Sequence, residues 1–242
     1  YVNEMTYYLK KTALTLIVIL GLGSIDACRK KYIATSEDMA QHGWVLYIDK
    51  DYINSNSWFR DATVKNSEWK DAYNGLGWSY AQLAGATAQH ALLDSGISNF
   101  VNGLKKPIEE WEATDDEGNI TDVHAEILAG LTFSYHAKGK DSKVIEYGSA
   151  FLDSTTFNDE GLPAPNWYFS HDLDSLLNYL DVRITMAASY FAEGKFDSSI
   201  IQVSVILDSL KSAETPVTDT TLVGRKNIAE QIKSLQEYLR TR

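Results

Sequence analysis

The sequence repeats itself, and this periodicity constrains the fold more than any other feature. Gly43-Trp44 recurs as Gly77-Trp78 after 34 residues, and three tyrosines follow at intervals of 55 residues. The longer interval equals one 34-residue unit with an insert of 21 residues. Apolar residues within the units are spaced by three and four positions, as in amphipathic helices. The pattern therefore predicts an all-α fold built from repeated helix pairs. The tyrosines are Tyr80, Tyr135 and Tyr190.

Two short motifs connect these units to a known family. Residues 73 to 80 read Tyr-x-x-Leu-Gly-x-x-Tyr, and Ser55 precedes Phe59 by four positions. These residues resemble the tetratricopeptide repeat (TPR), in which a Trp-x2-Leu-Gly-x2-Tyr helix precedes an Ala-x3-Phe helix. The resemblance implies an α-solenoid of four TPR-like helix-turn-helix repeats over residues 36–212, with a C-terminal capping helix over residues 219–242. Inserts are expected near residues 103–123 and 156–176.

The resemblance also assigns small residues to the helix crossings. The repeats are expected to start near Ser36, Lys70, Ala125 and Leu180. Small residues allow the close approach of paired helices. In the second helix of each repeat, the corresponding position falls on Ser55, Gln89, Val144 and Ser199.

The amino-terminal segment has the order of a targeting sequence. Residues 12 to 25 are apolar, follow Lys10 and Lys11, and are too short for a spanning helix of about 20 residues. Residues 25 to 28, Ile-Asp-Ala-Cys, resemble the lipobox of bacterial lipoproteins. This resemblance implies a signal peptide over residues 1–27, a lipid on Cys28 and a tether over residues 28–35. Because Arg29 follows the cysteine, it also implies an outer-membrane lipoprotein that faces the periplasm. An uncleaved signal anchor and a buried core helix are the alternatives.

An aromatic row marks the candidate binding surface. The concave face of a helical-repeat stack is lined by the first helix of each repeat. In the TPR family the ninth position of that helix often faces the groove, which here implies Trp44, Trp78 and Phe133. Neighbouring positions add Tyr47, Asn74, Gln82, His136 and Phe191. Large aromatic side chains with a few polar groups suit a protein or peptide partner. The competing interpretation is that the row is core and that the inserts lie over it.

The charge of the chain limits its partners. The formal net charge is -11, which argues against nucleic-acid binding. Acidic residues at the starts of the four first helices either stabilise the helix dipoles or make the groove rim negative, so a neutral or basic partner is expected. These residues are Glu37, Asp71, Glu126 and Asp181.

We expect no metal, no cofactor and no catalytic residues from the motifs. There is one cysteine, and the histidines lack the spacing of metal ligands. Ser170-His171-Asp172 is adjacent in sequence and lacks the nucleophile elbow of hydrolases. The acidic first insert fails the EF-hand pattern at Ala113 and His124, which leaves a solvated turn or a weak divalent site. The second insert ends in three aromatic residues that either pack back on the helices or form a contact patch.

These features together indicate an interaction protein. The expected function is that of a lipid-anchored cell-envelope protein acting as a protein–protein interaction adaptor or assembly scaffold, and not as an enzyme. The alternative is a substrate-capture lipoprotein that binds a peptide or sugar for an outer-membrane transporter, which stacked aromatics near Trp111, Trp167 and Tyr168 would favour. A divergent enzyme would require histidine and carboxylate groups that converge in a deep pocket.

Overall fold

The computed structural model describes residues 33–107, 123–153, 167–171 and 176–242. The chain divides into two units, Tyr1–Ala34 and Thr35–Arg242. Over the described residues of the second unit it forms nine helices and no strand, which confirms the predicted all-α class. The helices are α2 (Ser36–Ile48), α3 (Tyr52–Lys65), α4 (Lys70–Thr87), α5 (Ala91–Leu104), α6 (Val123–Ala137), α7 (Asp141–Asp153), α8 (Tyr179–Ala192), α9 (Phe196–Ser209) and α10 (Leu222–Thr241).

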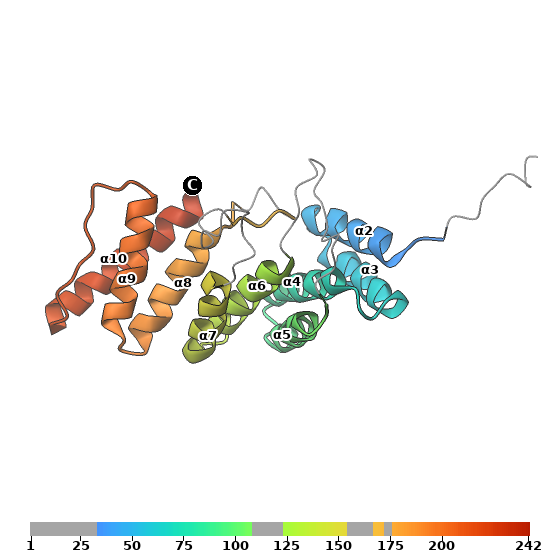
Figure 1. The fold of residues 1–242 in the computed structure, drawn as a ribbon, viewed down its shortest axis with the longest axis horizontal. Coiled ribbons are helices and arrows are strands. Elements are labelled where there is room, and N and C mark those ends of the chain that lie inside the picture. Colours follow the sequence, from blue (N-terminus) through green and yellow to red (C-terminus); the bar gives the residue numbers. More distant parts are fainter. Residues whose placement is uncertain (1–32, 108–122, 154–166, 172–175) are drawn as a thin grey trace, which may run out of the picture. The chain divides into compact units, whose positions relative to one another are not determined.

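The helices pack in chain order. Each helix from α2 to α9 contacts the next one, and Figure 1 shows the pairs side by side. A second set of contacts joins α2, α4, α6, α8 and α10, each to the next of this series. The first helices of successive pairs therefore adjoin one another, and this is the face on which the candidate site lies. Among the described helices, none combines the length and the apolar character needed to cross a membrane.

The same turn joins the two helices of three pairs. Lys50, Gly139 and Gly194 each take a left-handed backbone conformation, with φ of 63°, 63° and 73°. In each turn, the amide of the left-handed residue donates to the carbonyl three residues back, and the next amide donates to the carbonyl five residues back. Such paired bonds satisfy the open carbonyl groups at a helix end. Glycine adopts this conformation without steric cost at two of the three turns.

Two phenylalanines are wedged between neighbouring helix pairs. The fully buried ring of Phe59 on α3 lies against Gly43 of α2 and Gly75 of α4. The ring of Phe100 on α5 lies in the same way against Gly77 of α4 and Gly130 of α6. A side chain at any of these glycines would occupy the space of a ring. The packing distance between pairs is therefore set by a phenylalanine on one helix and glycines on two others.

The same type of hydrogen bond occurs where the helices of the first pair (α2 and α3) cross and where those of the last pair (α8 and α9) cross. The Ser55 hydroxyl donates to the carbonyl of Gly43 at 2.9 Å, and the Ser199 hydroxyl donates to that of Ala187 at 2.8 Å. Both pairs of residues are twelve positions apart. In the third pair, Gly148 of α7 leaves a space that Met186 of α8 fills.

The prediction that Gln89 lies at the helix crossing of the second pair is wrong. Gln89 lies in the turn between α4 and α5, whereas Gly96 of α5 packs against the backbone of Gly77. The reason is the length of α4, which has 18 residues where α2 has 13 and α6 has 15. Gly96 also precedes Phe100 by four positions, as Ser55 precedes Phe59.

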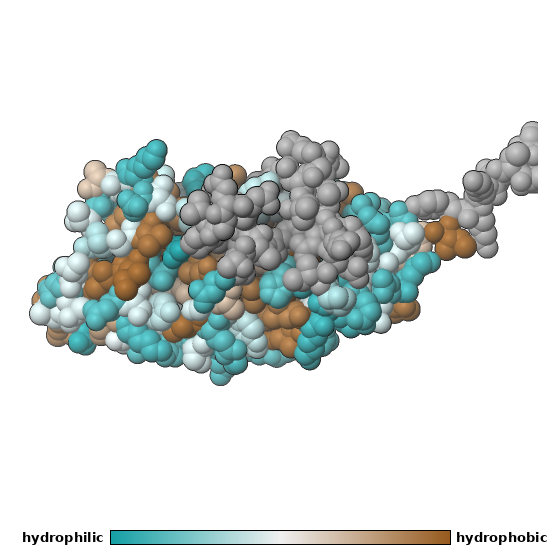
Figure 2. All heavy atoms as spheres, in the orientation of Figure 1, coloured by the Kyte–Doolittle hydropathy of each residue, from teal (hydrophilic) through white to brown (hydrophobic). Residues whose placement is uncertain are grey.

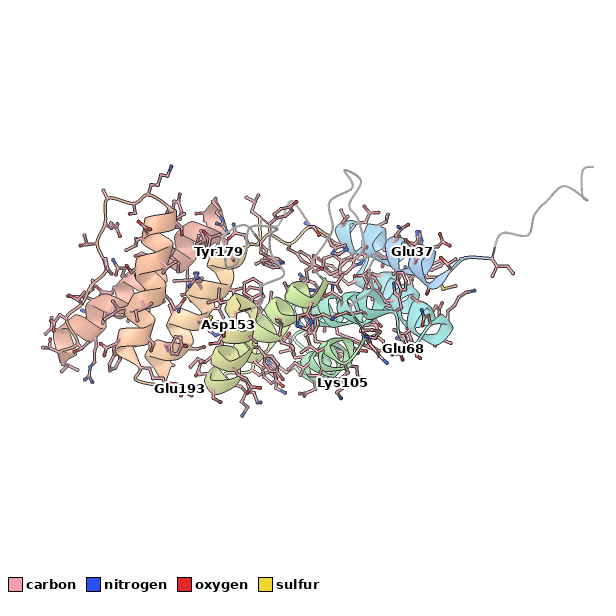
Figure 3. All side chains as sticks on the ribbon, viewed as in Figure 1. Glu37, Glu68, Lys105, Asp153, Tyr179 and Glu193 are labelled. Atoms are coloured by element: carbon pink, nitrogen blue, oxygen red, sulfur yellow. The ribbon has the colours of Figure 1, made fainter. Side chains whose placement is uncertain are left out.

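Two groups of buried apolar side chains form the core. One extends over α2 to α7, residues 167–169 and the first half of α8, and the other joins α8, α9 and α10. Tyr179, at the start of α8 in Figure 3, packs against both groups. On the face drawn in Figure 2, the described hydrophobic residues form separate patches among hydrophilic ones.

Gly77→Ala should destabilise the fold by about 1–3 kcal/mol, because its methyl group collides with Phe100 and the ring has no room to move toward Gly130. The matched control is Gly85→Ala on the same helix, where nothing lies within 4 Å. This control should stabilise by about 0.5–1 kcal/mol through helix propensity. Urea unfolding followed by circular dichroism measures both free energies. Equal effects of the two substitutions would contradict the claim that the Phe100 ring fills the space beside Gly77.

Candidate functional site

A short segment of the chain, residues 167–171, covers the first helices. We call it the covering segment. It pairs with the residues before α8, because the Phe169 amide donates to the carbonyl of Leu177 at 2.8 Å and the Tyr179 amide to that of Trp167 at 3.1 Å. Tyr168 and Asn178 form an isolated antiparallel bridge at this point. The covering segment is therefore fixed at one end by backbone hydrogen bonds.

Aromatic side chains fix the covering segment to the helices. Trp167 is buried edge-on against Phe151 of α7, with ring centroids 5.0 Å apart. The Phe169 ring is buried 4.5 Å from Trp78 of α4. The expectation that these aromatics pack back on the helices is confirmed for Trp167 and Phe169, whereas Tyr168 is 47% exposed.

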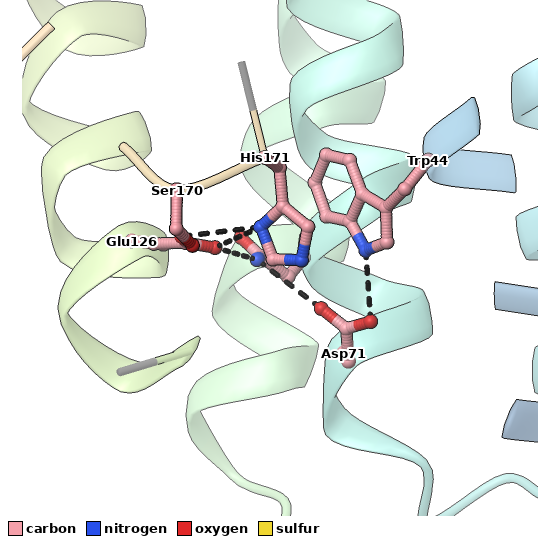
Figure 4. Close-up of polar contacts among 6 residues, drawn as sticks. Trp44, Asp71, Glu126, Ser170 and His171 are labelled. Carbon is pink, nitrogen blue, oxygen red and sulfur yellow. Dashed lines mark hydrogen bonds and ion pairs between the residues drawn. The ribbon is translucent and has the colours of Figure 1, made fainter. Parts of the chain in front are cut away.

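A buried group of polar side chains lies beneath the end of the covering segment (Figure 4). His171 stacks on the Trp44 indole of α2, with centroids 3.8 Å apart, and its Nδ1 lies 2.9 Å from a Glu126 oxygen of α6. The Trp44 Nε1 donates to Asp71 of α4 at 2.8 Å. Three first helices and the covering segment thus meet in one hydrogen-bonded network. We call it the polar cluster; its members are Trp44, Asp71, Asn74, Glu126, Ser170 and His171.

The polar cluster holds two carboxylates away from water. The exposed fraction is 6% for Asp71 and 1% for Glu126. Burial raises the pKa of Asp71 above its usual value, although His171 and the bond from Trp44 lower it. Burial lowers the pKa of His171, but the charge of Glu126 and their hydrogen bond outweigh it, so the pKa is raised. Glu126 therefore stabilises the protonated form of His171.

The structure places the predicted groove residues in three environments. Trp44 and Tyr47 are buried, and the ring of Phe169 lies 6.0 and 6.1 Å from theirs. Asn74 and Trp78 are also buried. Gln82 is half-buried and donates to the Tyr47 hydroxyl at 3.0 Å. Phe133 is half-buried, His136 is exposed, and Phe191 packs on Phe196 near α9. Cys28, Trp111 and the acidic first insert lie outside the described residues.

Two pockets lie between the first helices beside the covering segment. One, of about 360 Å³, is lined by Trp78 and Gln82 of α4 and by Phe133 of α6. The other, of about 460 Å³, extends from Phe133 and His136 to α8 and α10. Both pockets include Phe133 and Leu177, so they adjoin. Four of the eight predicted groove residues therefore line open space: Trp78, Gln82, Phe133 and His136.

The acids at the helix starts do not share one environment. Glu37 is exposed, whereas Asp71 and Glu126 belong to the polar cluster. Asp181 is half-buried in the larger pocket, 2.6 Å from Arg242. Burial raises the pKa of Asp181, against the opposing effect of backbone hydrogen bonds and Arg242. The expectation of a neutral or basic partner thus depends on the net charge of -11 more than on a row of rim acids.

Sequence reasoning missed the polar cluster. Asp71 and Glu126 stand near the starts of corresponding helices, a pattern that predicts a dipole effect or a negative rim, and His171 is 45 residues beyond Glu126. The recurrence of the acid was the available signal. The cluster has the converging histidine and carboxylates that an enzyme would need, but the larger and smaller pockets are lined by other residues. In the described residues, the polar cluster links three first helices to the covering segment.

In comparisons with known proteins, no family model and no curated protein matches the sequence. The function proposed for the chain therefore depends on its own residues.

Trp44→Phe should destabilise the chain by about 2 kcal/mol, because it removes a donor from the buried Asp71 carboxylate. Trp58→Phe is the control, since Trp58 is half-buried on α3, and its effect should be about 1 kcal/mol or less. Chemical unfolding of both variants gives the comparison. If the two losses are equal, the bond to Asp71 contributes no stability.

Proposed function

We propose that this chain is a TPR-like, lipid-anchored protein of the bacterial cell envelope that acts as a protein–protein interaction adaptor or assembly scaffold. The observation that carries the proposal is the pair of adjoining pockets on successive first helices. They lie beside the part of the predicted groove that the covering segment closes. Support for the TPR-like arrangement comes from the repeated turn at Lys50, Gly139 and Gly194 and from the two phenylalanine wedges.

The pockets suit side chains of a partner segment. The smaller one is lined mainly by apolar groups, with Gln82 and Ser134 as polar groups, and the larger one adds His136 and two arginines. Apolar pockets with a few polar groups anchor the side chains that dominate binding energy. The shared Phe133 and Leu177 place these anchors next to each other, as a continuous peptide requires. The partner is a protein or peptide, and the negative net charge favours a neutral or basic one.

Substrate capture for an outer-membrane transporter is the second proposal. A pocket of about 460 Å³ also has the size of a small-ligand site. Of the aromatics that this function would use, Trp167 is buried against the helices and Tyr168 is the exposed one. Of these two aromatics in the described residues, only Tyr168 thus offers a face for stacking on a sugar, which is why the adaptor is the first proposal.

Phe133→Ala should weaken partner binding by about 10- to 100-fold, since a truncated anchor costs roughly 2 kcal/mol or more. Phe191→Ala is the matched control, because Phe191 is also half-buried on a first helix and lines neither pocket. A photocrosslinker at His136, compared with one at the exposed Val64 of α3, identifies the partner in cells of the source organism. Crosslinks to the same proteins from both positions would contradict a pocket-specific adaptor.

Cys28→Ser should move the protein from the membrane fraction to the soluble fraction, because the lipid is proposed to sit on this cysteine. Fractionation with mass spectrometry of residue 28 measures the change. Retention of the variant in the membrane would contradict lipid anchoring and favour the uncleaved signal anchor.

A further inference from the structure

The polar cluster contains the elements of a metal site. Asp71, Glu126 and His171 each offer a ligand atom, and these atoms all lie within 4.8 Å of one another. The three residues come from α4, α6 and the covering segment. Two carboxylates and one imidazole are ligands that divalent transition-metal ions accept.

Asn74 supplies a second, independent observation. Its side chain is fully buried and aimed between the two carboxylates, with Nδ2 2.6 Å from Glu126 and 3.4 Å from Asp71. Its Oδ1 has no hydrogen-bond partner among the described residues. A buried amide oxygen without a partner is costly. Nδ2 faces the carboxylates in this structure; a half-turn of the amide would exchange it with Oδ1, which would turn the oxygen toward a cation bound between the carboxylates and move Nδ2 to the present position of Oδ1.

The charges favour a cation. The polar cluster contains two buried carboxyl groups and a single histidine, so it holds more acidic than basic groups. A divalent ion with a neutral imidazole would balance both carboxylates. Burial of charge is tolerated where the groups are paired or coordinate a metal.

We propose that the polar cluster binds one divalent transition-metal ion, with Zn²⁺ as the best fit, through Asp71, Glu126, His171 and the amide oxygen of Asn74. Four ligands of nitrogen and oxygen match the tetrahedral preference of zinc. In a tetrahedral zinc site with bonds of about 2.0–2.2 Å, neighbouring ligand atoms lie roughly 3.4 Å from one another. The ligand atoms of Asp71, Glu126 and His171 lie within 4.8 Å of one another, so each distance has to shorten by about 1.5 Å at most.

The surroundings of the site support this coordination. Trp44 donates to Asp71 and stacks on the imidazole, and the Ser170 hydroxyl donates to Glu126 at 3.1 Å. Groups that hold the ligands in this way set their orientation in metal sites. The ion would link the covering segment to α4 and α6, and so fix the segment that covers half of the predicted groove.

Zinc titration of the untagged, full chain after treatment with a chelator tests the proposal. We expect one zinc ion per chain and a loss of affinity of at least about 100-fold in His171→Gln. His136→Gln, which removes an exposed histidine, should bind zinc as the wild type does. Binding of less than one equivalent, or unchanged affinity in folded His171→Gln, overturns the site.

X-ray absorption of the zinc-loaded wild type keeps the test decisive if His171→Gln does not fold. The expected spectrum shows about four nitrogen or oxygen ligands at about 2.0–2.1 Å, with scattering from one imidazole. A sulfur ligand would place the ion on Cys28, and two or more imidazoles would place it on other histidines. Either result overturns the proposal. Circular dichroism establishes the folding of each variant.

Discussion

The burial of Asp71 and Glu126 is the constraint on which the arrangement of the first helices depends. An ionised carboxylate is stable away from water only when charged or hydrogen-bonding groups surround it. Here those groups come from different parts of the chain: Trp44 from α2, Asn74 from α4 and His171 from the covering segment. The position of the covering segment is thereby tied to the packing of α2, α4 and α6. Loss of one partner leaves a buried carboxyl oxygen with one hydrogen bond fewer.

The spacing of the helix pairs and the candidate binding surface follow from the same packing. Phe59 and Phe100 set the separation of successive pairs, because each ring faces glycines on two neighbouring first helices. The first helices then present side chains to a common face, which the covering segment closes over Trp44 and Tyr47. The pockets that include Phe133 remain open beside it. In the proposed adaptor, the partner would bind at this open part.

Local patterns in the sequence predicted much of the fold. The helices at Ser36 and Lys70 begin at the expected residues, because periodic apolar residues and turn residues are encoded locally. The equivalent of Ser55 in the second pair could not be placed from a fixed repeat length, since α4 extends beyond the expected turn and moves the crossing to Gly96. Such patterns could not predict the polar cluster, because the bonds that join its different helices and the covering segment connect residues 27 to 52 positions apart in the sequence.

The same limit applies to the predicted groove. The spacing of Trp44, Trp78 and Phe133 identified one face of the first helices, but a segment about ninety residues beyond Trp78 covers part of that face. Which aromatics are covered depends on contacts that no local spacing encodes. Trp44 and Trp78 are buried, although Trp78 still lines the smaller pocket, and the half-buried Phe133 lines both pockets.

The most direct test of this account is hydrogen exchange of the covering segment in the native chain. The Phe169 and Tyr179 amides are bonded to Leu177 and Trp167, so their exchange should be slowed by a factor of about 100 or more. The amide of the exposed Thr218, in the loop before α10, provides an internal reference. Protected exchange at Phe169 and Tyr179 would support a fixed cover over the first helices. Exchange of both amides at the rate of an unstructured peptide would contradict it.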